Sequence, residues 1–229
     1  MKRLVIVGAS GMVGGYAARY ALGSSDVQRV VSIGRKTLGI SDAKMTEVRH
    51  ADFADCSALA GTLADQDAVV FCLGTYTGVV SDVEMRRITV DYTLEFARVL
   101  HASSPGATFA FLSGNGADPT GSSRIAFARF KGAAEKALMA AGFPRLYLFR
   151  PAYIYPVEPR REPALSYRFL RAIYPLFRAL FPRLVIRSDD LGRAMVDLCI
   201  RDGTKSETLV LENRDIQALV NAAKARNSF

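Results

Sequence analysis

The chain has 229 residues, a length that fits one domain, and half of its residues are hydrophobic, which is enough for a buried core. Its formal net charge is +8, but most of the excess lies between Arg160 and Arg187, where seven arginines stand against Glu162 alone. The rest of the chain is nearly neutral, which argues against a general nucleic-acid binder. We expect no transmembrane segment, because no run of about 18 uncharged apolar residues occurs.

An apolar strand followed by regularly spaced glycines opens the chain. Leu4–Val7 is predicted to be a buried strand, and Met12–Leu22 is predicted to be a helix. Between them, the glycine spacing is typical of a dinucleotide-binding turn, in which Gly8 permits the turn, Gly11 lets backbone approach a phosphate and Gly14 lets the helix pack closely. The helix N-terminus would offer free N–H groups to a pyrophosphate. The predicted cofactor residues of this turn are Gly8, Ser10, Gly11, Met12, Val13 and Gly14.

The second predicted strand, Arg29–Ile33, runs into two basic residues. A cofactor with a free ribose 2′-hydroxyl usually meets an acid there, but no carboxylate occurs between Asp26 and Asp42. Arg35 instead offers a planar fork suited to a 2′-phosphate, and Lys36 adds charge. NADP is therefore favoured over NAD, with an ordinary solvated basic turn as the alternative.

Strand and helix signals alternate along the remainder of the chain. Further strands are predicted at Lys44–His50, Ala68–Leu73, Phe109–Ser113 and Arg145–Arg150, with a short last strand at Thr208–Leu211. Such alternation implies βαβ units. We therefore predict an α/β fold, a Rossmann-type doubly wound parallel sheet with a small C-terminal substrate lobe, whose ligands bind outside the carboxyl ends of the strands.

Serines mark the beginnings of three predicted helices. Ser81 begins a capping box, and Ser122 or Ser123 is predicted to cap a helix that runs to Gly142. Ser188 is predicted to cap a later helix, with two acids in its first turn.

The pattern changes after Arg150 to a stretch rich in proline and arginine, followed by an aromatic amphipathic segment, Ser166–Phe181. We predict one NAD(P)-binding domain over 1–229, with a core at 1–150, a substrate lid or lobe at about 151–187, and a closing helix and strand in 188–229. The arginines of 160–187 could bind an anionic substrate, lie on a membrane surface, or cover apolar surface with their stems. All three alternatives stay open.

Three isolated cysteines, Cys56, Cys72 and Cys199, form neither a Cys-x-x-Cys pair nor a metal-ligand spacing. We therefore expect reduced thiols, no metal site and a cytoplasmic location.

Six short motifs follow one another along nearly the whole chain. They are Gly8-Ala-Ser-Gly11-Met-Val-Gly14, Gly34-Arg35, Ala51-Asp52-Phe53, Phe71-Cys-Leu-Gly-Thr75, Leu112-Ser-Gly-Asn-Gly-Ala-Asp118 and Phe149-Arg-Pro-Ala-Tyr153. In order and spacing the chain resembles the short-chain dehydrogenase/reductase superfamily, in its atypical NAD(P)-binding branch with the Tat-interacting oxidoreductase-like and NAD-dependent epimerase/dehydratase-like proteins. The resemblance implies that Asp52 contacts adenine, beside Phe53, and that Leu73 and Gly74 lie along the cofactor. Asp52 could alternatively cap a helix that begins near Asp55.

The resemblance also implies a catalytic Tyr-x-x-x-Lys on a helix, in which the lysine holds the ribose and lowers the pKa of the tyrosine. This chain has Phe127-Ala-Arg-Phe-Lys131 instead. Lys131 is in place, but Phe127 has no ionisable proton. Ser113 and Asn115 are both candidates for the group that polarises the substrate.

Another tyrosine could replace the missing one. Tyr76, Tyr153 and Tyr155 follow predicted strands on the ligand side of the sheet, although aromatic residues also line pockets for area alone. His50 and His101 are weaker candidates, because dipole or capping roles suffice at a strand end and a helix end. The predicted catalytic residues are therefore Lys131, Ser113, Asn115 and Tyr153.

Together these patterns favour an NADP-binding oxidoreductase that transfers a hydride to or from a small carbonyl or alcohol, with an anionic substrate as one option. The alternative is a non-catalytic NADP-binding redox sensor or scaffold, which Phe127 favours. A basic nucleic-acid or membrane binder rests on charge alone. No oligomeric state follows from the sequence.

Overall fold

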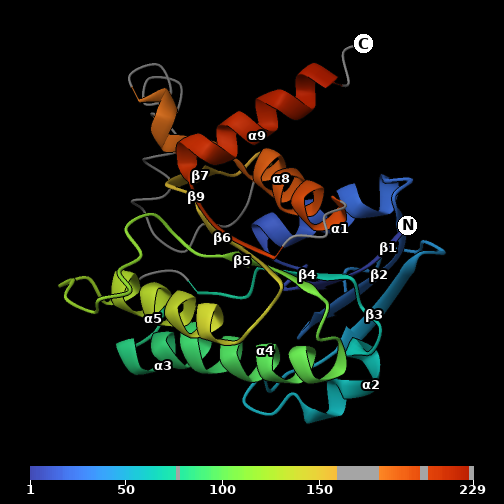
Figure 1. Cartoon of the computed structure of the whole chain (residues 1–229), viewed down its shortest axis with the longest axis horizontal. Helices are drawn as coiled ribbons and strands as arrows, with labels where there is room; N and C mark the ends of the chain where they lie inside the picture. The colour runs from blue at the N-terminus through green and yellow to red at the C-terminus, as the bar shows by residue number, and fades with distance from the viewer. Residues whose placement is uncertain (76–77, 159–180, 202–205, 227–229) are drawn as a thin grey trace.

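The computed structural model describes residues 1–75, 78–158, 181–201 and 206–226, and a seven-stranded sheet forms its centre (Figure 1). The strands lie in the order β3-β2-β1-β4-β5-β6-β9, and every neighbouring pair is parallel. Their bounds are β1 Lys2–Val7, β2 Val27–Gly34, β3 Met45–Arg49, β4 Ala68–Phe71, β5 Thr108–Leu112, β6 Arg145–Arg150 and β9 Glu207–Glu212. The predicted doubly wound parallel sheet is confirmed, and each predicted strand is displaced at its ends by two residues at most.

Helices cover both faces of the sheet (Figure 1). One face carries α1 Met12–Gly23, α8 Ser188–Ile200 and α9 Asn213–Arg226. The other carries α2 Ala60–Leu63, α3 Asp82–Arg86, α4 Tyr92–Ser103 and α5 Ala126–Ala140, with 3-10 turn η1 at Ser57–Leu59 and π-helical turn η2 at Arg87–Asp91. The segment 35–44 between β2 and β3 contains no helix.

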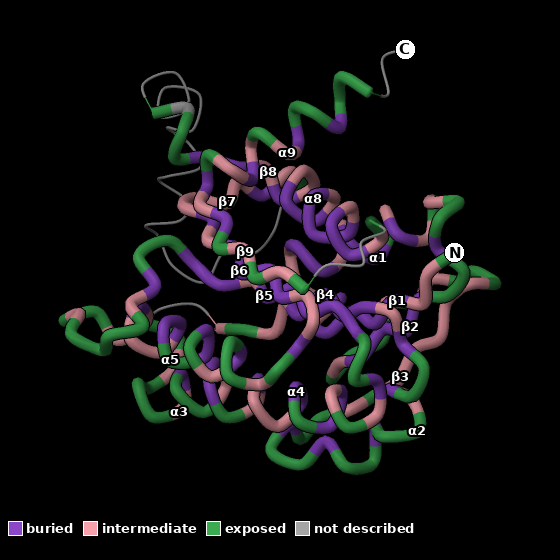
Figure 2. The backbone as a smooth tube through the Cα atoms, in the orientation of Figure 1, coloured by how far each residue is buried: buried purple, intermediate pink, exposed green. Residues whose placement is uncertain are grey.

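Alternate side chains of the strands build two cores, one on each face. In β1, Leu4 and Ile6 belong to the core beneath α1 and α8, whereas Val5 and Val7 belong to the core beneath α4 and α5. This period of two is the geometry of a strand buried on both faces. Figure 2 shows the burial concentrated in the sheet and the inward faces of the helices. Among the described residues, no helix combines the length and apolar character needed to cross a bilayer.

One of the three predicted serine caps is present. The Ser81 hydroxyl accepts a hydrogen bond of 3.3 Å from the Glu84 backbone N–H at the beginning of α3. The Ser122 and Ser123 prediction is wrong, because α5 begins only at Ala126. Asp118 competes for both serines: its carboxylate accepts from the Ser122 hydroxyl at 3.2 Å and from the Ser123 N–H at 2.7 Å.

The Ser188 cap is also wrong, although the helix exists. Ser188 is the first residue of α8 and Arg187 occupies the N-cap position without a side-chain cap. The Ser188 hydroxyl instead accepts a hydrogen bond of 3.2 Å from the Val157 N–H, and thereby ties the segment after β6 to α8. The helix ends nevertheless carry the expected charge, since Asp189 and Asp190 lie in the first turn.

A second, parallel pair of short strands was not predicted. β7 Tyr153–Tyr155 pairs with β8 Val185–Arg187, and the 3-10 turn η3 Pro182–Leu184 precedes β8. Apart from Phe181, the amphipathic segment predicted over 166–181 lies outside the described residues, as does most of the arginine-rich stretch.

Candidate functional site

The turn after β1 has the geometry that its glycines predict. Gly8 has φ +78°, a conformation that side chains disfavour, and a Cβ there would lie 3.0 Å from the carbonyl of Cys72. The Gly8 N–H donates to the Ile33 carbonyl at 3.1 Å, and the Gly11 N–H donates to the Gly8 carbonyl at 2.8 Å. The turn is therefore fixed between β2 and β4, at the carboxyl ends of the strands.

The beginning of α1 is free of competing side chains. Gly11 occupies the N-cap position, no side chain caps the helix, and its first turn contains no acid. A Cβ on Gly14 would lie 2.5 Å from the Gly8 carbonyl oxygen, so the helix can approach the turn this closely only with glycine there. The N–H groups of a first helical turn have no partner inside the helix, and they carry partial positive charge. An anion would fit this end of α1.

A cavity of about 230 Å³ opens in front of this helix end. Its lining comprises Ala9, Ser10, Gly11, Met12, Gly15, Tyr16 and Arg19 from the turn and α1, with Leu38, Pro156, Val157, Glu158 and Ser188 opposite. Three predicted cofactor residues, Ser10, Gly11 and Met12, thus meet in one space. Val13 lies in the core with 3 % of its surface exposed, so only its backbone can face a ligand.

The residues predicted for the adenosine end lie beyond β2 and β3. Arg35 and Lys36 are exposed directly after β2. Asp52 is exposed and accepts a hydrogen bond of 3.0 Å from the Ala54 N–H, so it stabilises the turn after β3 and caps no helix. Phe53 is buried in the core, where the His50 ring packs on it at 5.0 Å, and its side chain cannot reach a ligand.

The residues predicted to lie along the cofactor, and the tyrosines that could replace the missing catalytic one, follow β4 and β6. Leu73 is half-buried and Gly74 is exposed after β4, and Tyr76 lies outside the described residues. Tyr153 and Tyr155 are half-buried on β7.

Lys131 lies on α5, and its side chain reaches the carboxyl end of β5. Its ammonium group donates to the Leu112 carbonyl at 2.7 Å and lies 4.6 Å from the centre of the Phe111 ring. Only 6 % of the residue is exposed, and this burial lowers the pKa of Lys131 to about 8. These two contacts hold the ammonium group in place, and close to its pKa its charge responds to a nearby partner.

Ser113 has a structural partner. Its hydroxyl donates to the buried Glu135 carboxylate, which also forms an ion pair with Arg150. Arg150 reaches on to Glu212 at 3.0 Å, so the network joins β5, α5, β6 and β9. This arrangement argues against Ser113 as the polarising group. Asn115 is exposed, and its N–H donates to the Pro151 carbonyl at 2.9 Å.

The residue in contact with Phe127 is Gly114, which sequence reasoning missed. A Cβ on Gly114 would lie only 2.6 Å from Cζ of the Phe127 ring and 2.7 Å from Cε1. The ring therefore fills the space of a side chain at position 114. The one available signal was the glycine standing between the two polar candidates, Ser113 and Asn115.

The histidines and cysteines lie in packed surroundings. His101 is in the last turn of α4, and its ring packs on Phe143 at 5.1 Å. The three cysteines are unpaired, and burial raises the pKa of the Cys56 and Cys72 thiols to about 12. The described part of the chain contains no group of three or more side chains placed to hold a metal ion.

Comparison with known proteins agrees with this geometry. The model of the NAD dependent epimerase/dehydratase family matches residues 4–125, more than half of the chain. "Protein fmp52, mitochondrial" of Emericella nidulans is 25% identical over 205 residues, 86% of this chain and 87% of that protein. "Protein HTATIP2" of Rattus norvegicus is 30% identical over 155 residues, 67% of this chain and 63% of that protein.

Solved structures share the fold. The Bordetella bronchiseptica enzyme WbmH in complex with NAD+ has a TM-score of 0.70 at 18% identity, covering 100% of this chain and 82% of that one. The UDP-glucuronic acid 4-epimerase of Bacillus cereus in complex with NAD has a TM-score of 0.69 at 14% identity, covering 97% and 84%.

Two earlier expectations are decided by these matches. The relatives named Fmp52 are described as mitochondrial, a finding that overturns the cytoplasmic location expected from the isolated cysteines. The resemblance to atypical short-chain dehydrogenases is confirmed, and with it an oxidoreductase-like, nucleotide-binding fold. The chain belongs to the NAD dependent epimerase/dehydratase family.

Proposed function

We propose that this protein binds NADP(H) across the carboxyl ends of its strands and transfers a hydride to or from a small carbonyl or alcohol. The uncapped beginning of α1, which opens on a cavity beside the Gly8 turn, carries this proposal. The first-turn N–H groups would bind the pyrophosphate, and Ser10 lies exposed beside them. A nicotinamide cofactor therefore fits the residues present.

Each end of such a cofactor would meet suitable side chains. Arg35 and Lys36 would pair with a 2′-phosphate, and Lys131 would hold the nicotinamide ribose through its remaining N–H groups. The bound cofactor would supply the hydride. At neutral pH Lys131 is mainly protonated, since its pKa is about 8, so it keeps the donors that this role needs.

The cofactor preference is the first test. NADPH is expected to bind more tightly than NADH, and Arg35→Ala should remove most of that preference, with a loss of about 1.5–3 kcal/mol for a charged hydrogen bond. Calorimetric titration of both cofactors measures it. Arg29→Ala is the matched control, because Arg29 lies on β2, which leads to Arg35, and donates to the Thr46 hydroxyl, away from the carboxyl end. Equal affinity of the natural protein for both cofactors contradicts the NADP assignment.

A second candidate function, a non-catalytic NADP(H) sensor or scaffold, is favoured by the apolar pair of Phe127 and Gly114. Neither residue supplies a proton, and the Ser113 hydroxyl is engaged by Glu135. Losing a general acid costs about 10²–10⁴ in rate.

Phe127→Tyr separates the two candidates. The variant places a phenol beside Gly114, four residues before Lys131, and is expected to raise NADPH-dependent carbonyl reduction by at least about tenfold. Oxidation of NADPH against a panel of aldehydes and ketones gives the rates. Phe130→Tyr adds a phenol on the same helix away from Gly114 and should change nothing. Strong activity of the natural protein would point to another proton donor, whereas inactivity of both proteins on the whole panel would support the sensor.

A further inference from the structure

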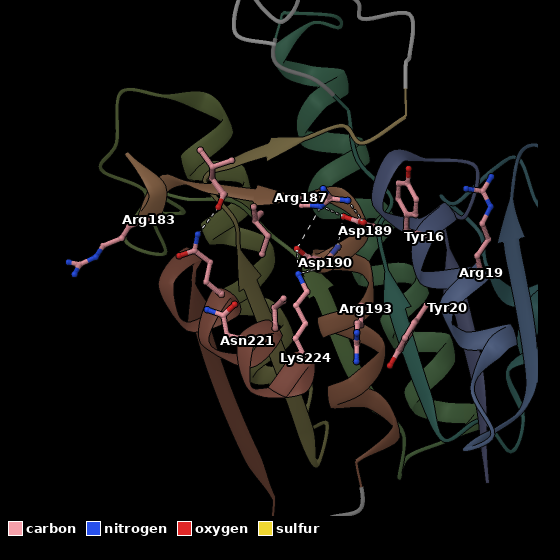
Figure 3. Close-up of a pocket in the computed structure, with 14 residues that line it drawn as sticks. Tyr16, Arg19, Tyr20, Arg183, Arg187, Asp189, Asp190, Arg193, Asn221 and Lys224 are labelled. Carbon is pink, nitrogen blue, oxygen red and sulfur yellow. Dashed lines mark hydrogen bonds and ion pairs between the residues drawn. The ribbon is translucent and has the colours of Figure 1, made fainter. Parts of the chain in front are cut away.

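A second, larger cavity of about 970 Å³ lies between α1, α8 and α9 (Figure 3). Its volume is that of a small-molecule site. None of the residues assigned above to the cofactor or to the chemistry lines it. The cavity is therefore a separate space, on the outer side of the helices that cover one face of the sheet.

Positive charge predominates on the walls. Two carboxylates, Asp189 and Asp190, line the cavity, against five cationic side chains, Arg19, Arg183, Arg187, Arg193 and Lys224. Both acids already have cationic partners: Asp189 binds Arg187 through both carboxylate oxygens, at 3.0 and 2.7 Å, and Asp190 lies 2.8 Å from the Lys224 ammonium. Arg19 and Arg193 have acidic partners just outside the lining, Glu158 at 3.1 Å and Asp197 at 3.5 Å, so the walls favour an anion through the donor N–H groups that these ion pairs leave over.

Two buried polar atoms in the wall have no hydrogen-bond partner within the described part of the chain. They are the Tyr16 hydroxyl oxygen and Nε of Arg193. Arg193 is nevertheless held in place, because its guanidinium stacks over the Tyr20 ring at 5.3 Å and its Nε lies 3.5 Å from the Asp197 carboxylate. Burial and the nearby Glu158 carboxylate raise the pKa of Tyr16, so its hydroxyl stays protonated and able to donate. A ligand oxygen within reach would complete the hydrogen bonding of both groups.

We propose that this cavity binds a small phosphorylated molecule. A phosphate group presents several strong acceptor oxygens, which suits the arginine and lysine side chains that α1, α8 and α9 contribute to the walls, together with a tyrosine hydroxyl.

The two cavities share a wall, and this links the proposed ligand to the cofactor. Tyr16 and Arg19 line both of them. Arg19 also lies 3.1 Å from the carboxylate of Glu158, which lines the smaller cavity beside Gly11. A phosphate that draws Arg19 away would leave Glu158 unpaired near the N-terminus of α1. That free carboxylate would oppose a pyrophosphate, so the ligand should weaken NADP(H) binding, a consequence that rests on the proposed function.

Inorganic tripolyphosphate is a suitable probe, titrated calorimetrically into the whole chain. We expect saturable binding that weakens by at least about tenfold in the double variant Arg193→Gln/Lys224→Gln and by about fivefold in Tyr16→Phe, which removes one hydroxyl and no charge. Arg214→Gln is the matched control, since this exposed arginine lies on α9 outside the cavity. An equal loss in Arg214→Gln would mean diffuse attraction to a basic protein and would overturn the proposal. So would unchanged binding in Tyr16→Phe and in the double variant.

The linkage has its own readout. The dissociation constant of NADPH should rise several-fold in saturating tripolyphosphate. Tripolyphosphate should still bind, several-fold more weakly, to protein whose glycine turn is already filled by NADPH, which distinguishes the linkage from competition for the turn. In Glu158→Gln the rise should be largely lost, because no carboxylate is uncovered. An NADPH affinity indifferent to tripolyphosphate overturns the linkage. If NADPH does not bind at all, the proposed function fails, whereas the tripolyphosphate series still decides whether the second site exists.

Discussion

Alanine in place of Gly14 is expected to abolish NADPH binding at accessible concentrations and to destabilise the fold by about 1–3 kcal/mol. The added Cβ would meet backbone on every near side: the Gly8 oxygen at 2.5 Å, the Gly8 carbonyl carbon at 2.9 Å and Cα of Ala9 at 3.0 Å. Backbone cannot rotate away as a side chain can, so the turn and α1 must separate. A displacement of about 1 Å at a binding turn can cost about hundredfold in function.

Gly23→Ala is the control for this experiment, because Gly23 ends the same helix and a Cβ there meets nothing within 4 Å. That substitution should leave NADPH affinity unchanged and stabilise α1 slightly. Calorimetry gives the affinities, and urea unfolding gives the free energies of unfolding. Undiminished NADPH binding by Gly14→Ala would show that the phosphates bind elsewhere.

Lys131→Met is expected to move stability and cofactor binding in opposite directions. Burial lowers the pKa of Lys131 from 10.5 to about 8, so the folded state disfavours this charge by up to about 3 kcal/mol at neutral pH. Methionine fills a similar space without the charge, although it leaves the Leu112 carbonyl without its donor, so the gain should be smaller than that bound. NADPH affinity should fall at least about tenfold, through loss of a charged hydrogen bond to the ribose.

The pH dependence of this effect has a definite sign. Between pH 8 and 10.5 the folded natural protein binds fewer protons at Lys131 than the unfolded chain does, so its stability should rise with pH across that window. The advantage of Lys131→Met should therefore shrink as the pH increases. Urea unfolding at several pH values measures it, with the exposed Lys136→Met on the same helix as control. A variant less stable than the natural protein at pH 7 would contradict the argument.

Local patterns made most of the sheet predictable. The central strands β1, β4, β5 and β6 contain apolar runs of one segment, and periodicity detects such runs without knowledge of their neighbours. The pair of β7 and β8 was not predicted, because each strand has only three residues and its partner lies about 30 residues away in the sequence. The predicted cap of α5 by Ser122 or Ser123 was wrong for a related reason. Both serines form hydrogen bonds with Asp118, an interaction that capping rules do not include.

In the candidate site too, features set by adjacent residues were predictable, and contacts between distant residues were not. The Gly8 turn and the beginning of α1 follow from adjacent residues, so their geometry was predictable. The partner of Ser113 was not, because Glu135 and Arg150 reach it only through the packing of α5 against β5 and β6. The same holds for Arg19 and Glu158, which meet across 139 residues of sequence.

The contact between Phe127 and Gly114 also constrains the evolutionary history open to this chain. While an aromatic ring occupies position 127 in its present place, a serine at 114 would begin with a Cβ 2.6 Å from that ring. Exchanging the ring for a phenol keeps this contact, so a protein with hydroxyl groups at both positions requires the far end of the ring to shift away from residue 114. To introduce hydroxyl groups at both positions, an engineer would first have to repack the contact between residues 127 and 114 and only then substitute the two residues.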